Sequence, residues 1–476
     1  MYKPLYLSIP AYFHVLAPVH VDGNYLTSLV DPGKDEVGAI PEEIASILEE
    51  SLEHDEVDTP DGIWPVIWEL AGQAVDRAMH PIFMTPDAVY LLVFDLSKNL
   101  FTKEVECIDS SLDQIMRCMN TVHSLKQTAD NESFPPVILV GTHADCVKDG
   151  TESRMNCLSD RLCQNPLIAE HVVRHFTVDN TQSGQASGRE DPEIVRLRQT
   201  ILEMAETMPH TKKEIPLHWL KIESTAEDKA RKGVKYVTRS EFKKDIIEKD
   251  CEIEEGDDIE QILNFLHDRG TIVYHHRQGN PDDLVVLDPQ WLLDVIRQIL
   301  NVTPSKDESM KIRKCRRQLK DKGILDTELL EHACKKLGVY EIKQSLLFIM
   351  EKFNLLCRCP SKENKPMFLV PCMLAEVPEG NIIPGITDDG SSPVYLTFDT
   401  DYVPEGFFSR LVTLFGAWVA SKTSCEQQQI HANAACFILD DKNFLGLVCY
   451  KSVIKLNVWS QDDSFRDSGC HSQVCR

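Results

Sequence analysis

A run of six consecutive apolar residues, 89–94, constrains the fold more than any other feature of this chain. Strands that are apolar on both sides are typical of parallel sheets covered by helices on both faces. The run belongs to a longer alternation of strand-like and helix-like segments, which indicates an α/β sheet with its ligand at the carboxyl ends of the strands. The expected strands are 64–70, 89–95, 137–141 and 172–178, and the expected helices are 41–54, 102–126 and 190–207.

The pattern changes near residues 209–216, where we expect the α/β domain to end. The polar run 181–189 is interpreted as a loop inside that domain, because the closing helix follows it. Beyond the boundary, two helices and a hairpin predict a winged-helix-like arrangement. Its expected elements are a helix capped by Ser240, a helix opened by Asp257 and Asp258, strands at 271–275 and 284–287, and a further helix at 289–300.

A similar unit is expected to recur farther along the chain, with helices at 326–336 and 340–353 and strands at 355–359 and 367–371. Residues 375–392 are rich in proline, glycine and aspartate, as is typical of a linker. The last segment predicts an α+β domain. Its expected strands are 394–398, 436–439, 445–450 and 453–458, and its expected helix is 406–415.

The segment 68–73 (Trp-Glu-Leu-Ala-Gly-Gln) has the residue types that hold a γ-phosphate at the end of a strand. In a GTPase, a strand carries an acidic residue toward magnesium, a glycine N–H contacts the γ-phosphate, and a glutamine orients the attacking water. These roles fall on Glu69, Gly72 and Gln73. Aspartate is usual at the first position, and the extra methylene of Glu69 moves the carboxylate by about 1.5 Å. A shift of that size disturbs an octahedral magnesium shell. Gly-Gln after a strand is also common without any ligand.

A second motif follows the strand 137–141 and reads Thr142, His143, Ala144 and Asp145. A carboxylate at this position can accept hydrogen bonds from the N1 and N2 groups of guanine, so we predict that Thr142, His143 and Asp145 bind the base. The alternative is a strand-end turn in which Asp145 caps the next segment.

Together the two motifs resemble the Roc (Ras of complex proteins) domain. Residues 141–145 look like its Thr-His-x-Asp base motif, and residues 68–73 with 80–83 resemble its switch II stretch. Residues 215–220 and 287–292 resemble the first part of a COR (C-terminal of Roc) domain, and residues 404–411 resemble its second part.

Roc followed by COR is the order of the Roco family, and this chain is similar to its kinase-less scaffold members. The resemblance implies an incomplete α/β Ras-like domain followed by an α+β COR region with winged-helix-like and antiparallel-sheet parts. It also implies GTP or GDP and Mg²⁺ as ligands and homodimerisation through COR. The expected domains are an atypical N-terminal segment at 1–40, Roc at 41–210, and COR at 211–375 and 390–465.

The phosphate-binding loop of such a domain, Gly-x₄-Gly-Lys-Ser/Thr, does not occur in the sequence. The nearest string, 32–35 (Pro-Gly-Lys-Asp), lacks the first glycine and the hydroxyl. Backbone amides, the lysine and the hydroxyl of that loop hold the β- and γ-phosphates and magnesium. Two explanations stay open: a degenerate Roc domain, or a piece of a longer gene product.

Charge and cysteine usage narrow the function further. The formal net charge of −25 argues against a general nucleic-acid binder, which needs a basic face, but leaves room for a local basic site. The 16 cysteines are scattered through apolar runs without paired zinc-type spacing, so we expect buried free thiols in a cytoplasmic protein. No apolar run is long enough to span a membrane.

The basic segment 311–322 is a solvated face, a docking surface for the acidic Roc domain, or a DNA contact. His275 and His276 are expected at the surface or in packing.

The function predicted from these features is a Roc–COR signalling or scaffold protein with impaired or absent GTP hydrolysis. The alternative is a fragment of an active Roco GTPase that binds and hydrolyses GTP when its full N-terminus is present. A DNA-binding winged-helix regulator is a third possibility. The sequence names neither an upstream signal nor a protein partner.

Overall fold

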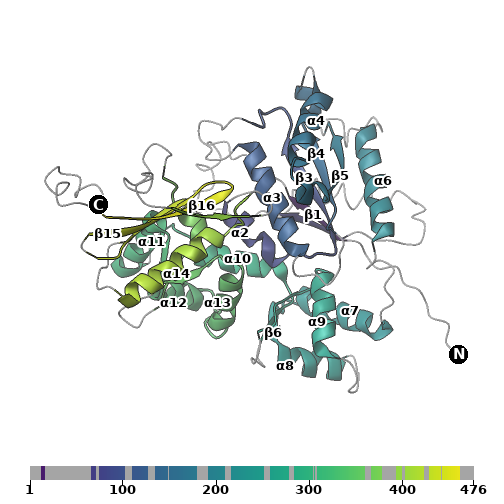
Figure 1. Cartoon of the computed structure of the whole chain (residues 1–476). Coiled ribbons are helices and arrows are strands. Elements are labelled where there is room, and N and C mark those ends of the chain that lie inside the picture. The colour runs from purple at the N-terminus through teal and green to yellow at the C-terminus, as the bar shows by residue number, and fades with distance from the viewer. Residues whose placement is uncertain are drawn as a thin grey trace. The chain divides into compact units, whose positions relative to one another are not determined.

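The computed structural model describes residues 12–16, 66–70, 74–101, 110–126, 134–147, 150–179, 191–208, 216–250, 258–277, 283–303, 305, 308–359, 366–377, 393–398, 402–422, 428–440 and 442–460. The chain forms two compact units (Figure 1). Unit 1 comprises Met1–Gln73 and Thr85–Ile215, and unit 2 comprises Ala74–Met84 and Pro216–Arg476. A short segment early in the chain therefore belongs to the later unit.

Unit 1 contains a parallel sheet in the order β2-β1-β3-β4-β5. The four predicted strands are confirmed to within two residues at each end, whereas β1 was not predicted. The chain passes from β2 across β1 to β3, so the strand order reverses beside β1. Sheets of this kind bind their ligands at such a reversal, just outside the carboxyl ends of the strands. The strands are β1 (Tyr12–Leu16), β2 (Val66–Leu70), β3 (Ala88–Asp95), β4 (Val137–Thr142) and β5 (Val172–Thr177).

Helices α3 (Ser111–Lys126) and α6 (Pro192–Thr207) lie on opposite sides of this sheet (Figure 1). The apolar face of α6 packs against alternate residues of β3 and β4, including Val89 and Ile138, which explains why these strands are apolar on both sides. The prediction missed α4 (Thr151–Leu162) and α5 (Pro166–Ala169). The predicted helix 41–54 and the first part of the predicted helix 102–126 lie outside the described residues.

The first part of unit 2 contains two three-stranded antiparallel sheets, and their common strand order confirms the predicted recurrence. In each sheet the last strand along the chain lies between the first and the second. The first strand of each sheet was not predicted. One sheet consists of β6 (Tyr236–Thr238), β7 (Val273–Tyr274) and β8 (Leu284–Val286), and the other of β9 (Ile324–Asp326), β10 (Cys357–Cys359) and β11 (Met367–Leu369).

Most helices of this part lie where the periodicity predicted them, but the helix Leu217–Arg231 was not predicted, and the predicted cap at Ser240 is wrong. Thr238 is the N-cap residue: its hydroxyl accepts from the backbone N–H of Glu241, and the Glu241 carboxylate accepts from the N–H of Thr238. Asp258 caps α9, as predicted. The helices are α7 (Leu217–Arg231), α8 (Arg239–Glu241), η5 (Phe242–Asp250), α9 (Ile259–Asp268), α10 (Pro289–Ile299), α11 (Met310–Lys322), α12 (Thr327–Lys336) and α13 (Lys343–Lys352).

The last part of unit 2 is an antiparallel sheet in the order β12-β16-β15-β14-β13, with α14 (Phe407–Lys422) packed on one face. The prediction ended this helix at residue 415, before the buried Val419 that extends its packed face. The strands are β12 (Val394–Thr397), β13 (Gln428–Ile430), β14 (Ala434–Ile438), β15 (Asn443–Cys449) and β16 (Val453–Ser460). Most of the predicted linker lies outside the described residues, and no described helix is long and apolar enough to cross a membrane.

Candidate functional site

The predicted base-binding residues lie together at the carboxyl end of β4. The register of the sheet pairs Thr142 with Asp95, the last residue of β3. The Thr142 hydroxyl donates to the carbonyl of Phe94 at 3.2 Å and lies 3.0 Å from Nδ1 of His143. Nδ1 of His143 is also 3.5 Å from the Asp95 carboxylate. The ends of two adjacent strands are therefore joined by a small polar network.

His143 adopts a left-handed backbone conformation, with φ of 57° and ψ of 38°. This conformation is uncommon outside glycine and turns the chain sharply at the end of the strand. The following N–H, of Ala144, donates to the carbonyl of Val178, just after β5. The turn is therefore connected to the ends of both neighbouring strands, and it leaves Asp145 exposed to solvent.

Asp145 is the exposed carboxylate of a small acidic group. Its carboxylate accepts a hydrogen bond from the Cys146 thiol at 3.4 Å. That bond is the main reason why the pKa of Cys146 is raised, and the charges of Asp145, Asp95 and Asp179 raise it further. A set of carboxylates attracts N–H donors, such as those of a guanine base, and repels phosphate.

Asp95, Cys146 and Asp179 were not predicted as site residues. Asp95 and Asp179 have the same signal as Asp145, because each is an acidic residue at or just past the end of a predicted strand. The N–H of Asp179 donates to Asp191 at 2.7 Å, and Asp191 also caps α6. The α6 cap thus holds the chain in position beyond the end of β5.

Of the residues predicted to serve phosphate and magnesium, the structure describes only the backbone of Glu69. Glu69 lies one residue before the end of β2, opposite Val15 of β1, and two strands separate β2 from β4. Gly72 and Gln73 lie outside the described residues, so their roles stay predictions.

The sequence directly after β1 differs from a phosphate-binding loop. In sheets of this order, phosphates bind at the carboxyl ends of the strands where the strand order reverses, which here is beside β1. Residues 17–24 there read Ala-Pro-Val-His-Val-Asp-Gly-Asn, with no lysine, serine or threonine. The lysine and hydroxyl side chains with which a P-loop holds phosphate and magnesium are therefore missing from residues 17–24, whereas Asp145 offers the carboxylate that a guanine base needs.

The segment that follows Gln73 is held by unit 2. It forms α2 (Ala74–Met79) and η2 (His80–Ile82). Asp76 is buried, and its carboxylate accepts from Nε of Arg297 in α10 at 2.7 Å. The carbonyl of Ile82 lies 3.2 Å from Nε2 of His275, which follows β7.

His275 has a packing role, which is one of the two predicted for it. Its ring lies against His267 and Phe353. Burial lowers the pKa of His275 well below its ordinary value and lowers that of His267 to about 4, so both rings are neutral at neutral pH.

Comparison with known proteins agrees with this division of the chain. Residues 216–374 match the family model described as "C-terminal of Roc, COR-A domain". Three relatives come from Dictyostelium discoideum. Cyclic GMP-binding protein C is 24% identical over 72% of this chain, the probable serine/threonine-protein kinase pats1 is 22% identical over 73%, and the probable kinase roco6 is 25% identical over 49%.

The matched segments span only 12%, 10% and 10% of the lengths of these three proteins. The COR-A match covers the recurrent winged-helix-like part of unit 2, where the sequence predicted the first part of COR. The relatives match regions that extend well beyond this part of the chain. The chain contains a COR-A domain and is similar to Roco-family proteins.

Proposed function

We propose that this chain is a Roc–COR signalling or scaffold protein that hydrolyses little or no GTP and acts through COR-mediated dimerisation. The main observation is that residues 17–24, directly after β1, contain neither the lysine nor the serine or threonine that holds phosphate and magnesium in a P-loop. Glu69 in place of aspartate supports the same view. The acidic group around Asp145 is then a remnant of a base pocket.

Nucleotide titration tests the first half of the proposal. The full chain is titrated with GTP and with GDP by calorimetry, with and without Mg²⁺. The expected result is no binding at micromolar nucleotide, because base contacts alone do not replace the phosphate contacts. A micromolar dissociation constant for either nucleotide, weakened by Asp145→Asn but not by the matched surface substitution Asp160→Asn, would refute it.

An exposed apolar stripe on α14 supports dimerisation through the second part of COR. Phe407, Leu414 and Trp418 are 39%, 68% and 50% exposed, and their spacing places them on one side of the helix. A different side of α14 packs on the sheet through residues such as Val412 and Val419. A stripe of this kind in a COR region fits a second copy of the chain.

Sedimentation velocity tests this surface. Leu414→Asp with Trp418→Asp should weaken a dimer by about 30-fold or more, because truncating one central aromatic residue typically costs ~2 kcal/mol or more. Val234→Asp changes an exposed apolar residue elsewhere in unit 2 and should leave the dimer unchanged. A monomeric chain, or a dimer that the double substitution does not weaken, contradicts the proposal.

The contacts of α2 and η2 support docking of the Roc-derived segment on COR. The ion pair between Asp76 and Arg297 joins residues 221 positions apart in the chain, and the carbonyl of Ile82 adds a second contact through His275. In this proposal, the segment after the GTPase-like motif connects the Roc-derived part of the chain to COR, whether or not nucleotide is hydrolysed.

The second candidate is a working Roco GTPase of which this chain is a piece, and the polar network at the end of β4 favours it. Gly72, Gln73, His143 and Asp145 then serve the nucleotide, and the phosphate loop is supplied by residues absent from the given sequence. Sequencing of the natural transcript decides between the two. An in-frame stop directly upstream of Met1 excludes this alternative, and an upstream Gly-x₄-Gly-Lys-Ser/Thr supports it.

A further inference from the structure

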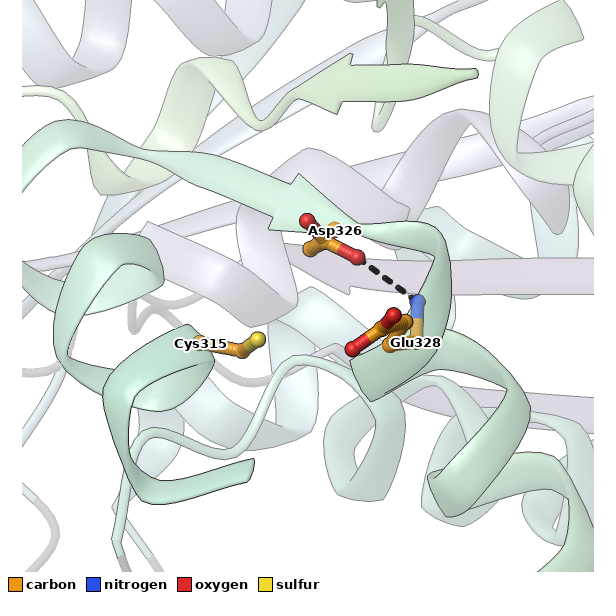
Figure 2. A group of neighbouring side chains, drawn as sticks. All are labelled: Cys315, Asp326 and Glu328. Carbon is orange, nitrogen blue, oxygen red and sulfur yellow. Dashed lines mark hydrogen bonds between the residues drawn. The ribbon is translucent and has the colours of Figure 1, made fainter. Parts of the chain in front are cut away.

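Three side chains that can bind metal meet where α11, β9 and α12 pack together (Figure 2). Cys315 lies in α11, Asp326 is the last residue of β9, and Glu328 lies in the first turn of α12. One ligand atom from each residue lies within 4.8 Å of the other two. The sequence shows no metal-binding spacing among these residues, because they come from three separate elements that meet only in the folded chain.

The Cys315 thiol is the least expected member of this group. Its residue is only 8% exposed, and it is one of the described cysteines that form no disulfide. Figure 2 shows the sulfur directed toward the carboxylate of Glu328. A buried thiol directed at two carboxylates is not explained by packing alone, since buried cysteines ordinarily lie among apolar side chains.

The two carboxylates are held in position by the local fold. One oxygen of Asp326 accepts from the backbone N–H of Glu328 at 2.8 Å, as the N-cap of α12. The cap fixes the direction of the carboxylate and leaves its second oxygen available. Capping also makes Asp326 and Glu328 parts of one short rigid turn.

We propose that Cys315, Asp326 and Glu328 bind a zinc ion, with water completing the shell. Thiolate and carboxylate ligands in a set of three with an open position suit Zn²⁺, whereas Mg²⁺ and Ca²⁺ prefer oxygen ligands alone. Bond lengths of about 2.3 Å to sulfur and 2.0 Å to oxygen require the ligand atoms to approach to roughly 3.5 Å. The spacing of up to 4.8 Å needs only side-chain rotations to reach this value. The ion would clamp the basic helix α11 to the second sheet of the COR-A domain.

Lys311 competes with the metal for the same carboxylate. Its ammonium donates to Glu328 at 2.6 Å, and its side chain is 70% exposed. A positive charge so close to the site opposes binding of a second cation. Removing this charge should therefore tighten zinc binding, an effect that a purely structural Cys315 would not produce.

The test uses the purified full chain, stripped with a chelator and kept reduced. Zinc affinity is measured by competition with a chromophoric chelator, and Co²⁺ is used as a spectroscopic probe because thiolate ligation gives a sulfur-to-cobalt charge-transfer band. Cys315→Ser should remove the band and lower zinc affinity by about 100-fold. Asp326→Asn, which preserves the cap, and Glu328→Gln should each weaken binding by ~10-fold or more, and Lys311→Met should tighten it by ~10-fold.

Cys334→Ser is the matched control, because this thiol is also buried but belongs to no such group. The control should leave both the cobalt band and the zinc affinity unchanged. Circular dichroism of each metal-free variant checks that it folds, and Lys311→Met, whose side chain is exposed, provides a readout that does not depend on core packing. Unchanged zinc affinity and an unchanged cobalt spectrum in Cys315→Ser would overturn the proposal, and so would unchanged affinity in Lys311→Met.

Discussion

Glu308 and Arg316 form a buried ion pair in the first part of unit 2. Both side chains are buried, and Arg316 donates to the two oxygens of Glu308 at 3.0, 2.9 and 2.6 Å. Another guanidinium nitrogen contacts the carbonyl of Asn301. The pair connects the residues after α10 to the middle of α11. Its hydrogen bonds also lower the pKa of Glu308, so the carboxylate is charged at neutral pH.

Removing the carboxylate leaves a buried guanidinium without its counter-ion, which typically costs 3–5 kcal/mol. Glu308→Gln retains one acceptor oxygen and should cost about 3 kcal/mol, whereas Glu308→Ala should cost about 5 kcal/mol. These losses correspond to a roughly 150-fold and a roughly 4,000-fold increase in the open population, at 1.4 kcal/mol per factor of ten. Glu308→Leu combined with Arg316→Met should be more stable than either single substitution, because no buried charge is left unpaired.

Labelling of Cys334 measures this opening. The thiol is fully buried in α12, which packs beside α11, so a thiol reagent reaches it only when this region opens. The labelling rate at neutral pH should rise by the factors above in the two Glu308 variants. Glu341→Gln, an exposed carboxylate on the loop before α13, should leave it unchanged. A rise of less than about 5-fold in Glu308→Gln would show that the pair contributes little, and the reasoning would then be wrong.

Three further predictions follow from contacts within unit 2. Arg297→Met leaves the buried Asp76 carboxylate unpaired, so hydrogen exchange of Ala74–Met84 should be ~5- to 30-fold faster, for a loss of about 1–2 kcal/mol; unchanged exchange would contradict this. The pKa of His267 is lowered from 6.5 to about 4, so only the unfolded chain is protonated between these values. The stabilisation from neutral His267 should be fully present above pH 6.5, and the free energy of unfolding should fall by about 3 kcal/mol as the pH is lowered to 4. Denaturant titrations should show a smaller fall in His267→Gln than in His175→Gln, which changes an exposed histidine and serves as the control. Thr238→Ala should lower the unfolding free energy by ~1 kcal/mol in urea, and Thr238→Ser should preserve it, because only the serine hydroxyl can still accept from Glu241; equal losses in both would exclude the cap.

The sequence determined the elements whose apolar pattern is long enough to read. The strands β3, β4 and β5 and the helices α6, α9 and α10 lie where hydrophobic periodicity predicted them, because each element must bury one face or both. The motif at the end of β4 was found by the same reasoning, since polar residues that follow a buried strand lie at a sheet edge. The resemblance to Roc and COR domains was also visible in the sequence, through the residues of their motifs and the order of the two domains.

Only the tertiary structure decided which distant residues meet. Short strands such as β6 and β9 have three residues each, too few for a period, and they exist because neighbouring strands supply their hydrogen bonds. The ends of β3 and β5 became part of the β4 site only when the strand order was known. The cluster at Cys315, the pairing of Asp76 with Arg297 and the placement of Ala74–Met84 in unit 2 have the same origin. Local patterns record what each segment buries, whereas contacts between segments far apart in the chain depend on packing that no single segment encodes.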